Sequence, residues 1–132
     1  MKKETINIVE GPKNNHAPSF FIGRYQPLHR GHIELMKTVL DEGKDIIIAL
    51  RDTPIQSTDP YSVEQRINMI KEAFPEAVVY PRKGRIVICA IPDMSEIVFG
   101  RGVGWGVRQI KLDEEIENIS ATKIRATQKN EK

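Results

Sequence analysis

Residues 18–32, which read PSFFIGRYQPLHRGH, decide the fold of this chain. The apolar run at 19–22 predicts a short buried strand that ends at Gly23. A loop follows as far as Gly31, and from Ile33 onward apolar residues recur at helical spacing. The segment therefore predicts a strand, a loop and a helix in succession, which is how a βαβ unit begins.

The same alternation continues downstream. Gly43 is expected to cap the end of the first helix, because glycine favours that position. Residues 46–50, IIIAL, form a continuous apolar run, which is typical of a parallel strand covered on both faces. Ser62 and Gln65 then fit a capping box at the start of a second helix, which Pro75 ends.

Further strands are expected at 77–80, 85–90 and 97–99, followed by a more exposed strand at 107–112 and a last short helix from Ser120. Strands that alternate with helices predict an α/β fold: a Rossmann-like, doubly wound, mainly parallel sheet in a single domain. Ligands of such sheets bind beyond the carboxyl ends of the strands, so the loops at those ends are the candidate site.

The length of 132 residues fits one domain. We expect residues 18–128 to form it, residues 1–17 to form an N-terminal arm or edge strand, and residues 129–132 to form a polar tail. Lys and Arg total 20 against 18 Asp and Glu, so the net charge is +2, and no long basic run is present. This balance favours a soluble globular protein that does not bind nucleic acid.

The remaining composition points to the cytoplasm. The one cysteine, Cys89, lies in the apolar run 86–90 and is expected to be a buried, unreactive thiol. No apolar stretch approaches the roughly 18 residues that a membrane-spanning helix needs, so no membrane contact is expected. The charged start, MKKE, lacks the apolar segment of a secretory signal, and we therefore expect a cytoplasmic location.

The loop at 23–32 carries the first candidate site. His29 and His32 stand at the mouth of the predicted helix, so both side chains can converge on one anion. Gly31 lets the backbone approach closely, and the unpaired N–H groups of a helix N-terminus bind phosphate. Arg24 adds a positive charge at the same junction. No third ligand with suitable spacing stands nearby, so no metal site is predicted among these residues.

The pattern from Phe21 to His32 resembles the G-x-[FY]-x-P-x-H-x-G-H signature of a nucleotidyltransferase superfamily. That superfamily includes nicotinamide mononucleotide adenylyltransferases, phosphopantetheine adenylyltransferase and glycerol-3-phosphate cytidylyltransferase. The form with Arg24 and Gln26 looks particularly similar to the archaeal nicotinamide mononucleotide adenylyltransferases. With the second motif below, the resemblance extends from Phe20 to Arg125.

Residues 119–125, ISATKIR, resemble the second motif of the family, I-S-[SA]-T-x-x-R. Ser120 and Thr122 suit the first turn of a helix, where hydroxyl and N–H groups bind phosphate oxygens, and Arg125 adds a planar cation. The resemblance implies that both motifs contact the nucleotide. The implied nucleotide-binding residues are Gly23, Arg24, Tyr25, His29, His32, Gly100, Arg101, Ser120, Ala121, Thr122 and Arg125.

Between the motifs, the run GRGVGWG at 100–106 does not fit the dinucleotide pattern G-x-G-x-x-G, because no glycine stands at the third position. By resemblance it lies where the family contacts the base and ribose. Relatives often carry G-x-[DR] there, so Gly102 leaves the choice of base open. Arg51 and Arg66 flank the loop before the second helix, and the resemblance implies that both bind the acceptor, although Arg66 also fits a solvated helix arginine.

The resemblance implies an enzyme that transfers AMP or CMP from ATP or CTP to a phosphorylated small molecule and releases pyrophosphate. His29, His32 and Arg125 are the implied catalytic residues, and Mg²⁺ is expected to accompany the NTP. A cytidylyltransferase acting on a sugar or polyol phosphate is one alternative, and a non-catalytic nucleotide-binding regulator is another. The family also implies a homo-oligomer, whereas the acceptor is not legible in the sequence.

Overall fold

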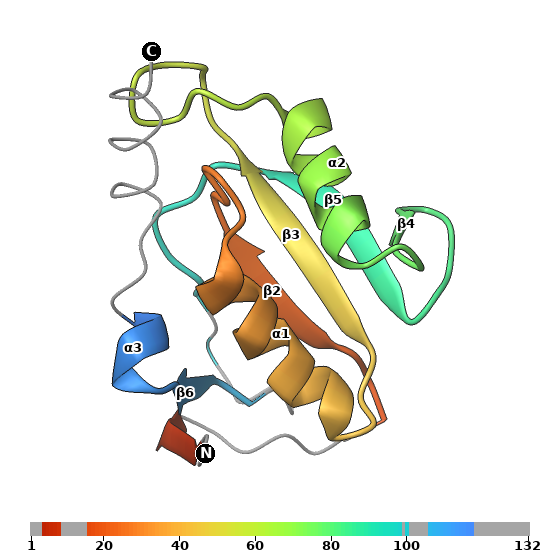
Figure 1. Cartoon of the computed structure of the whole chain (residues 1–132), viewed down its shortest axis with the longest axis vertical. Coiled ribbons are helices and arrows are strands. Elements are labelled where there is room, and N and C mark those ends of the chain that lie inside the picture. Colours follow the sequence, from red (N-terminus) through yellow and green to blue (C-terminus); the bar gives the residue numbers. More distant parts are fainter. Residues whose placement is uncertain (1–3, 9–15, 99, 101–105, 118–132) are drawn as a thin grey trace.

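The computed structural model describes residues 4–8, 16–98, 100 and 106–117. Its elements, in chain order, are β1 (Glu4–Ile8), β2 (Ser19–Gly23), α1 (Arg30–Asp41), β3 (Ile46–Asp52), α2 (Val63–Ala73), β4 (Val78–Val79), β5 (Ile86–Pro92), β6 (Arg108–Lys111) and α3 (Glu114–Glu117). Four of the strands form one parallel sheet in the order β2-β3-β5-β4. The predicted α/β fold with a mainly parallel, Rossmann-like sheet is therefore confirmed (Figure 1).

The main core lies between one face of this sheet and the two long helices. Ile48 of β3 lies opposite Ile88 of β5 in parallel register, and both side chains are completely buried. Met36 of α1 and Ile70 of α2 belong to the same apolar cluster. Each such side chain contributes about 1.5–3 kcal/mol of transfer free energy on burial. This packing holds the carboxyl ends of β2, β3 and β5 in fixed positions at one edge of the sheet.

The two faces of the sheet are covered differently. Figure 1 shows α1 and α2 on the same face, so the described part of the chain contains no second helical layer on the other face. On that other face Phe20 of β2 is 52% exposed, and its register partner Ile47 of β3 is half-buried. The continuous apolar run 46–50 therefore correctly indicated a parallel strand, although one face is less covered than that pattern predicts.

The predicted helix ends are confirmed. Gly43 follows α1 with a φ of 84°, and its N–H donates to the carbonyl of Leu40 at 2.9 Å. At the start of α2, the Ser62 side chain accepts from the N–H of Gln65 at 3.1 Å. The Gln65 side chain accepts from the N–H of Ser62 at 2.7 Å, which completes the capping box.

The predictions for the outer strands needed correction. Ile97 and Val98, expected in a strand, lie outside any strand and are exposed, while Phe99 lies outside the described residues. The strand expected at 107–112 is β6, and it pairs antiparallel with β1 instead of joining the main sheet. Residues 4–8 of the expected arm thus form a strand, while the helix expected from Ser120 lies outside the described residues.

Candidate active site

The loops that follow β2, β3 and β5 meet at one edge of the sheet. Because these three strands are parallel, their carboxyl ends all lie at that edge (Figure 1). The loop after β2 leads to α1 and contains the two predicted histidines, whereas the loop after β3 leads to α2. This edge is where parallel α/β sheets bind ligands.

His29 and His32 form a stacked pair at the start of α1. Their ring centroids are 3.7 Å apart and the ring planes differ by 21°. His29 is the N-cap residue, and its Nδ1 accepts from the N–H of Gly31 at 3.1 Å. The Nδ1 of His32 accepts from the N–H of His29 at 3.1 Å. The two rings thus form a reciprocal cap that fixes both side chains.

This cap determines which nitrogen of each ring carries the proton. A nitrogen that accepts a hydrogen bond from a backbone N–H has no proton of its own, so the proton of each neutral ring is on Nε2. Burial and the neighbouring His29 lower the pKa of His32 to about 3, and burial also lowers the pKa of His29. At neutral pH the pair therefore offers two neutral Nε2–H donors.

The helix N-terminus differs from the expectation based on free N–H groups. The N–H groups of His29 and Gly31 donate to the histidine rings, so they are not free to bind phosphate. Gly31 is needed for the same reason, because a Cβ at this position would lie 2.9 Å from Cε1 of His29. The glycine of the motif makes room for a histidine ring, and the cap uses Nδ1 of each ring and leaves Nε2 out.

Tyr25 and Gly23 support the pair from the core side. The Tyr25 ring packs edge-on against His32, with centroids 4.8 Å apart. Tyr25 is only 4% exposed, so it has little surface left for the predicted nucleotide contact. A Cβ at Gly23 would lie 2.8 Å from Cζ of Tyr25, which explains the glycine. Burial also raises the pKa of the Tyr25 hydroxyl.

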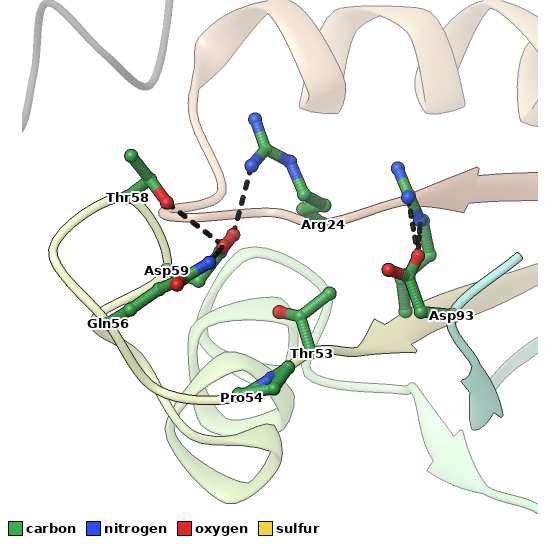
Figure 2. Close-up of a pocket in the computed structure, with 8 residues that line it drawn as sticks. Arg24, Thr53, Pro54, Gln56, Thr58, Asp59 and Asp93 are labelled. Carbon is green, nitrogen blue, oxygen red and sulfur yellow. Dashed lines mark hydrogen bonds and ion pairs between the residues drawn. The ribbon is translucent and has the colours of Figure 1, made fainter. Parts of the chain in front are cut away.

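A polar pocket of about 370 Å³ opens at the carboxyl ends of β2 and β3. Arg24 and Arg51 line it together with two carboxylates that pair with them (Figure 2). Nη1 of Arg24 donates to Oδ1 of Asp59 at 3.1 Å. Nε of Arg51 donates to Oδ1 of Asp93 at 2.7 Å, and its Nη2 contacts the same oxygen. The pocket therefore combines two cations with two anions.

Arg66 does not lie in this pocket. Its side chain is buried, with 1% of the residue exposed, and donates to main-chain carbonyls. Nη1 donates to the carbonyls of Arg24 and Arg51, each at 2.8 Å, and Nε donates to that of Ser62 at 3.2 Å. This burial excludes the alternative of a solvated arginine and leaves the side chain little surface for the acceptor, whose predicted contact with Arg66 stays a prediction. The buried side chain of Arg66 thereby connects the carboxyl ends of β2 and β3.

Three residues of this edge were not predicted as site residues. The Gln26 side chain donates to the carbonyl of Tyr61 at 3.0 Å and accepts from its N–H at 2.9 Å, which ties the two loops together. Asp59 and Asp93 hold the two arginines. No local signal identifies these partners, because they lie 35 to 42 positions away in the sequence.

The second motif lies outside the described residues, and so does Arg101. The predicted contacts of Arg101, Ser120, Ala121, Thr122 and Arg125 therefore stay predictions. Gly100 is described and exposed, with no neighbouring atom within 4 Å of where a Cβ would stand. Cys89 is half-buried rather than buried, and burial raises the pKa of its thiol.

The described part of the chain shows neither a metal-binding cluster nor a membrane-spanning helix. No group of three or more His, Cys, Asp or Glu side chains in this part of the chain is arranged to hold a metal ion. No helix among residues 4–8, 16–98 and 106–117 is long and apolar enough to cross a membrane.

The chain is similar in sequence to proteins of known name. The nicotinamide-nucleotide adenylyltransferase of Picrophilus torridus is 38% identical over 64 residues, which are 47% of this chain and 38% of that protein. The enzyme of that name from Thermococcus sibiricus is 31% identical over 77 residues, which are 57% of this chain and 40% of that protein. The chain thus spans well under two thirds of the length of these relatives.

A solved structure gives a weaker match. It is a bifunctional NMN adenylyltransferase/ADP ribose pyrophosphatase from Francisella tularensis, complexed with AMP and a manganese ion. It matches with a TM-score of 0.49 and 29% identity, over 59% of this chain and 23% of that one. The family model described as cytidylyltransferase-like matches residues 20–87, which include the histidine pair and the two pocket arginines, Arg24 and Arg51. Since that match covers just over half of the 132 residues, the chain belongs to the cytidylyltransferase-like family.

Proposed function

We propose that this chain is a nucleotidyltransferase that transfers AMP from ATP to a phosphorylated acceptor of the nicotinamide mononucleotide type, with release of pyrophosphate. The observation that carries the proposal is the stacked His29–His32 pair, whose Nδ1 atoms cap α1 and whose Nε2–H groups remain as donors. The names of the relatives, which are nicotinamide-nucleotide adenylyltransferases, support adenylyl over cytidylyl transfer.

The reaction needs alignment and charge stabilisation more than it needs a base. A phosphate oxygen of the acceptor attacks the α-phosphorus of MgATP, a new P–O bond forms, and the bond to pyrophosphate breaks. The acceptor phosphate is already ionised near neutral pH, so no proton has to be removed. The Nε2–H groups of His29 and His32 donate to the α- and β-phosphates as negative charge develops there. Their cap holds them in place beforehand, so little reorganisation is required.

The other charged residues complete the proposal. Ser120, Thr122 and Arg125 bind the β- and γ-phosphates, and Mg²⁺ enters on the phosphates of ATP as part of the substrate. Arg24 contacts the nucleotide and Arg51 the acceptor phosphate. The hydroxyl of Thr53 lies in the same polar pocket as Arg51, and it is buried with no hydrogen-bond partner in the described part of the chain. A buried hydroxyl without a partner is evidence that the pocket binds a polar ligand.

Pyrophosphate release tests the proposal directly. The purified chain is incubated with Mg²⁺ and each of ATP, CTP, GTP and UTP, against nicotinamide mononucleotide, phosphopantetheine, glycerol 3-phosphate and sugar phosphates. Release that requires ATP and nicotinamide mononucleotide supports the proposal. Release that requires CTP and a polyol phosphate would instead establish the cytidylyltransferase alternative.

The non-catalytic alternative has its own signature in the same assay. A regulator that has lost catalysis would bind an NTP without releasing pyrophosphate from any pair. If neither binding nor release is detected with any nucleotide, the proposed function is wrong.

A further inference from the structure

We infer that Asp59 is a positioning residue that holds the guanidinium of Arg24 towards the phosphates of the nucleotide. The inference rests on the proposed function, because it assumes that Arg24 contacts that nucleotide. Asp59 lies in the loop between β3 and α2, where the sequence alone predicted no site residue. It contacts Arg24 from 35 positions away and thereby connects this loop to the end of β2 (Figure 2).

The carboxylate of Asp59 is fixed from several directions. Its Oδ2 accepts from Nε2 of Gln56 at 2.9 Å and from the hydroxyl of Thr58 at 3.2 Å, while Oδ1 accepts from Arg24 at 3.1 Å. The backbones of Gln56 and Asp59 also exchange two hydrogen bonds, at 3.0 and 3.1 Å. A side chain with this many partners has little freedom to follow a ligand.

Asp59 is also a buried charge. Its side chain is only 4% exposed. Burial by itself raises the pKa of this carboxyl, but the hydrogen bonds from Gln56 and Thr58 and the nearby Arg24 outweigh burial, and the pKa is lowered. The carboxylate therefore stays ionised at neutral pH, and a charge-assisted hydrogen bond of this kind is stronger and more directional than a neutral one.

Arg24 has the complementary position. Its side chain is 44% exposed and lines the polar pocket, while Nη1 is bound to the buried carboxylate. A guanidinium has five N–H donors in a rigid plane, so fixing one edge orients the other donors. In the second pair both partners are accessible, since the side chains of Arg51 and Asp93 are 32% and 49% exposed. The two pairs differ in the carboxylate, because Asp59 is buried whereas Asp93 is exposed to solvent.

The test is a double-mutant cycle of Asp59→Asn and Arg24→Ala. Asparagine keeps the size of Asp59 and removes its charge. We expect Asp59→Asn to lower kcat/KM for ATP by about 10–100-fold, the usual size for a misplaced contact. It should also weaken equilibrium binding of ATP. In the Arg24→Ala background the same change should have no further effect, because Asp59 acts through Arg24.

The matched control is Asp45→Asn. Asp45 pairs with Arg85 at 3.8 Å, but it precedes β3 and so lies at the opposite end of the sheet. This variant should leave ATP binding and turnover unchanged. If Asp59→Asn does not fold, Gln56→Ala removes one support of the carboxylate and should give a smaller loss, again absent in the Arg24→Ala background.

Three outcomes would overturn the inference while leaving the proposed function intact. Losses that multiply in the double variant would show that Asp59 acts independently of Arg24. Tighter ATP binding by Asp59→Asn would show that the carboxylate competes with phosphate for Arg24. Unchanged ATP kinetics would show that the pair has only a structural role. If the wild-type chain binds no ATP, the proposed function fails, and this inference fails with it.

Discussion

Each histidine of the motif uses its two ring nitrogens for different tasks. Nδ1 accepts from a backbone N–H and holds the helix start, whereas Nε2 carries the proton and, in the proposed function, donates to a phosphate. Alanine removes both nitrogens together, so a loss of activity in His32→Ala would not separate the two tasks. Asparagine and glutamine do separate them, because their amide atoms overlay different ring positions.

We predict that His32→Asn lowers turnover by about 10²–10³-fold, the usual size for the loss of one charge-stabilising donor. The asparagine oxygen stands near the position of Nδ1 and can still accept from the N–H of His29, so the thermal midpoint should change little. His32→Gln is the matched variant, since its amide nitrogen stands near Nε2, and it should retain more activity. Equal turnover of His32→Asn and wild type would contradict the phosphate role.

The elements that bear the site are held by contacts at their ends. Helix α1 begins in the histidine cap and is followed by Gly43, while the guanidinium of Arg66 binds carbonyls at the ends of β2 and β3. Substitutions at these ends should therefore have effects that depend on what each end supports.

We predict that Gly31→Ala displaces the His29 ring, because the new Cβ would lie 2.9 Å from Cε1 of that ring. Alanine is the better helix former by about 0.5–1 kcal/mol, so stability should fall little while turnover falls strongly. Gly43→Ala is the control at the other end of α1, where the φ of 84° disfavours alanine. Gly43→Ala should lower the free energy of unfolding by about 1–2 kcal/mol without changing the KM for ATP. A large loss of stability in Gly31→Ala, together with a loss of activity in Gly43→Ala, would contradict this prediction.

We predict that Arg66→Met destabilises the chain by about 2–5 kcal/mol, because the carbonyls of Arg24 and Arg51 lose the guanidinium that donates to them, while that of Ser62 keeps only the backbone N–H of residue 66. Chemical denaturation measures this change. An acceptor-binding arginine would behave differently, raising the KM for the acceptor with little change in stability, and that result would support the original prediction.

For the whole molecule, the half-buried histidine pair links folding to pH. His32 has a pKa of about 3 in the folded chain and an ordinary value near 6.5 when unfolded. Between these values the unfolded chain binds a proton that the folded chain excludes. Stability should therefore fall as the pH drops from about 6.5 towards 3, by up to about 1.4 kcal/mol per unit. Above this window His32 contributes no pH dependence.

The measurement is the free energy of unfolding at pH 7 and pH 5, for wild type and for His32→Asn. The wild type should lose more stability than the variant between these values. Asp59 does not interfere with this comparison, because its carboxyl pKa is lowered from 3.8 and its contribution is lost only below the two pH values compared. Equal losses in both chains would show that folding does not hold His32 in its neutral form.

The local features of this protein follow from its sequence. The βαβ order, the capping box at Ser62, the glycine after α1 and the histidine motif all depend on residues within a few positions of one another. Periodicity, propensity and motif spacing report such short-range relations directly. The family resemblance rests on the same local patterns, and the match to residues 20–87 agrees with it.

Only the tertiary structure decided which distant residues meet. It buried Arg66 under the ends of two strands, placed Asp59 against Arg24, and paired β1 with β6 outside the main sheet. Arg66 illustrates the physical reason. An arginine in the first turn of a helix has the same local pattern whether it faces water or a set of carbonyls 15 and 42 positions away. The packing of strands and loops makes that choice, because burying a charge is favourable only where partners have already been brought together.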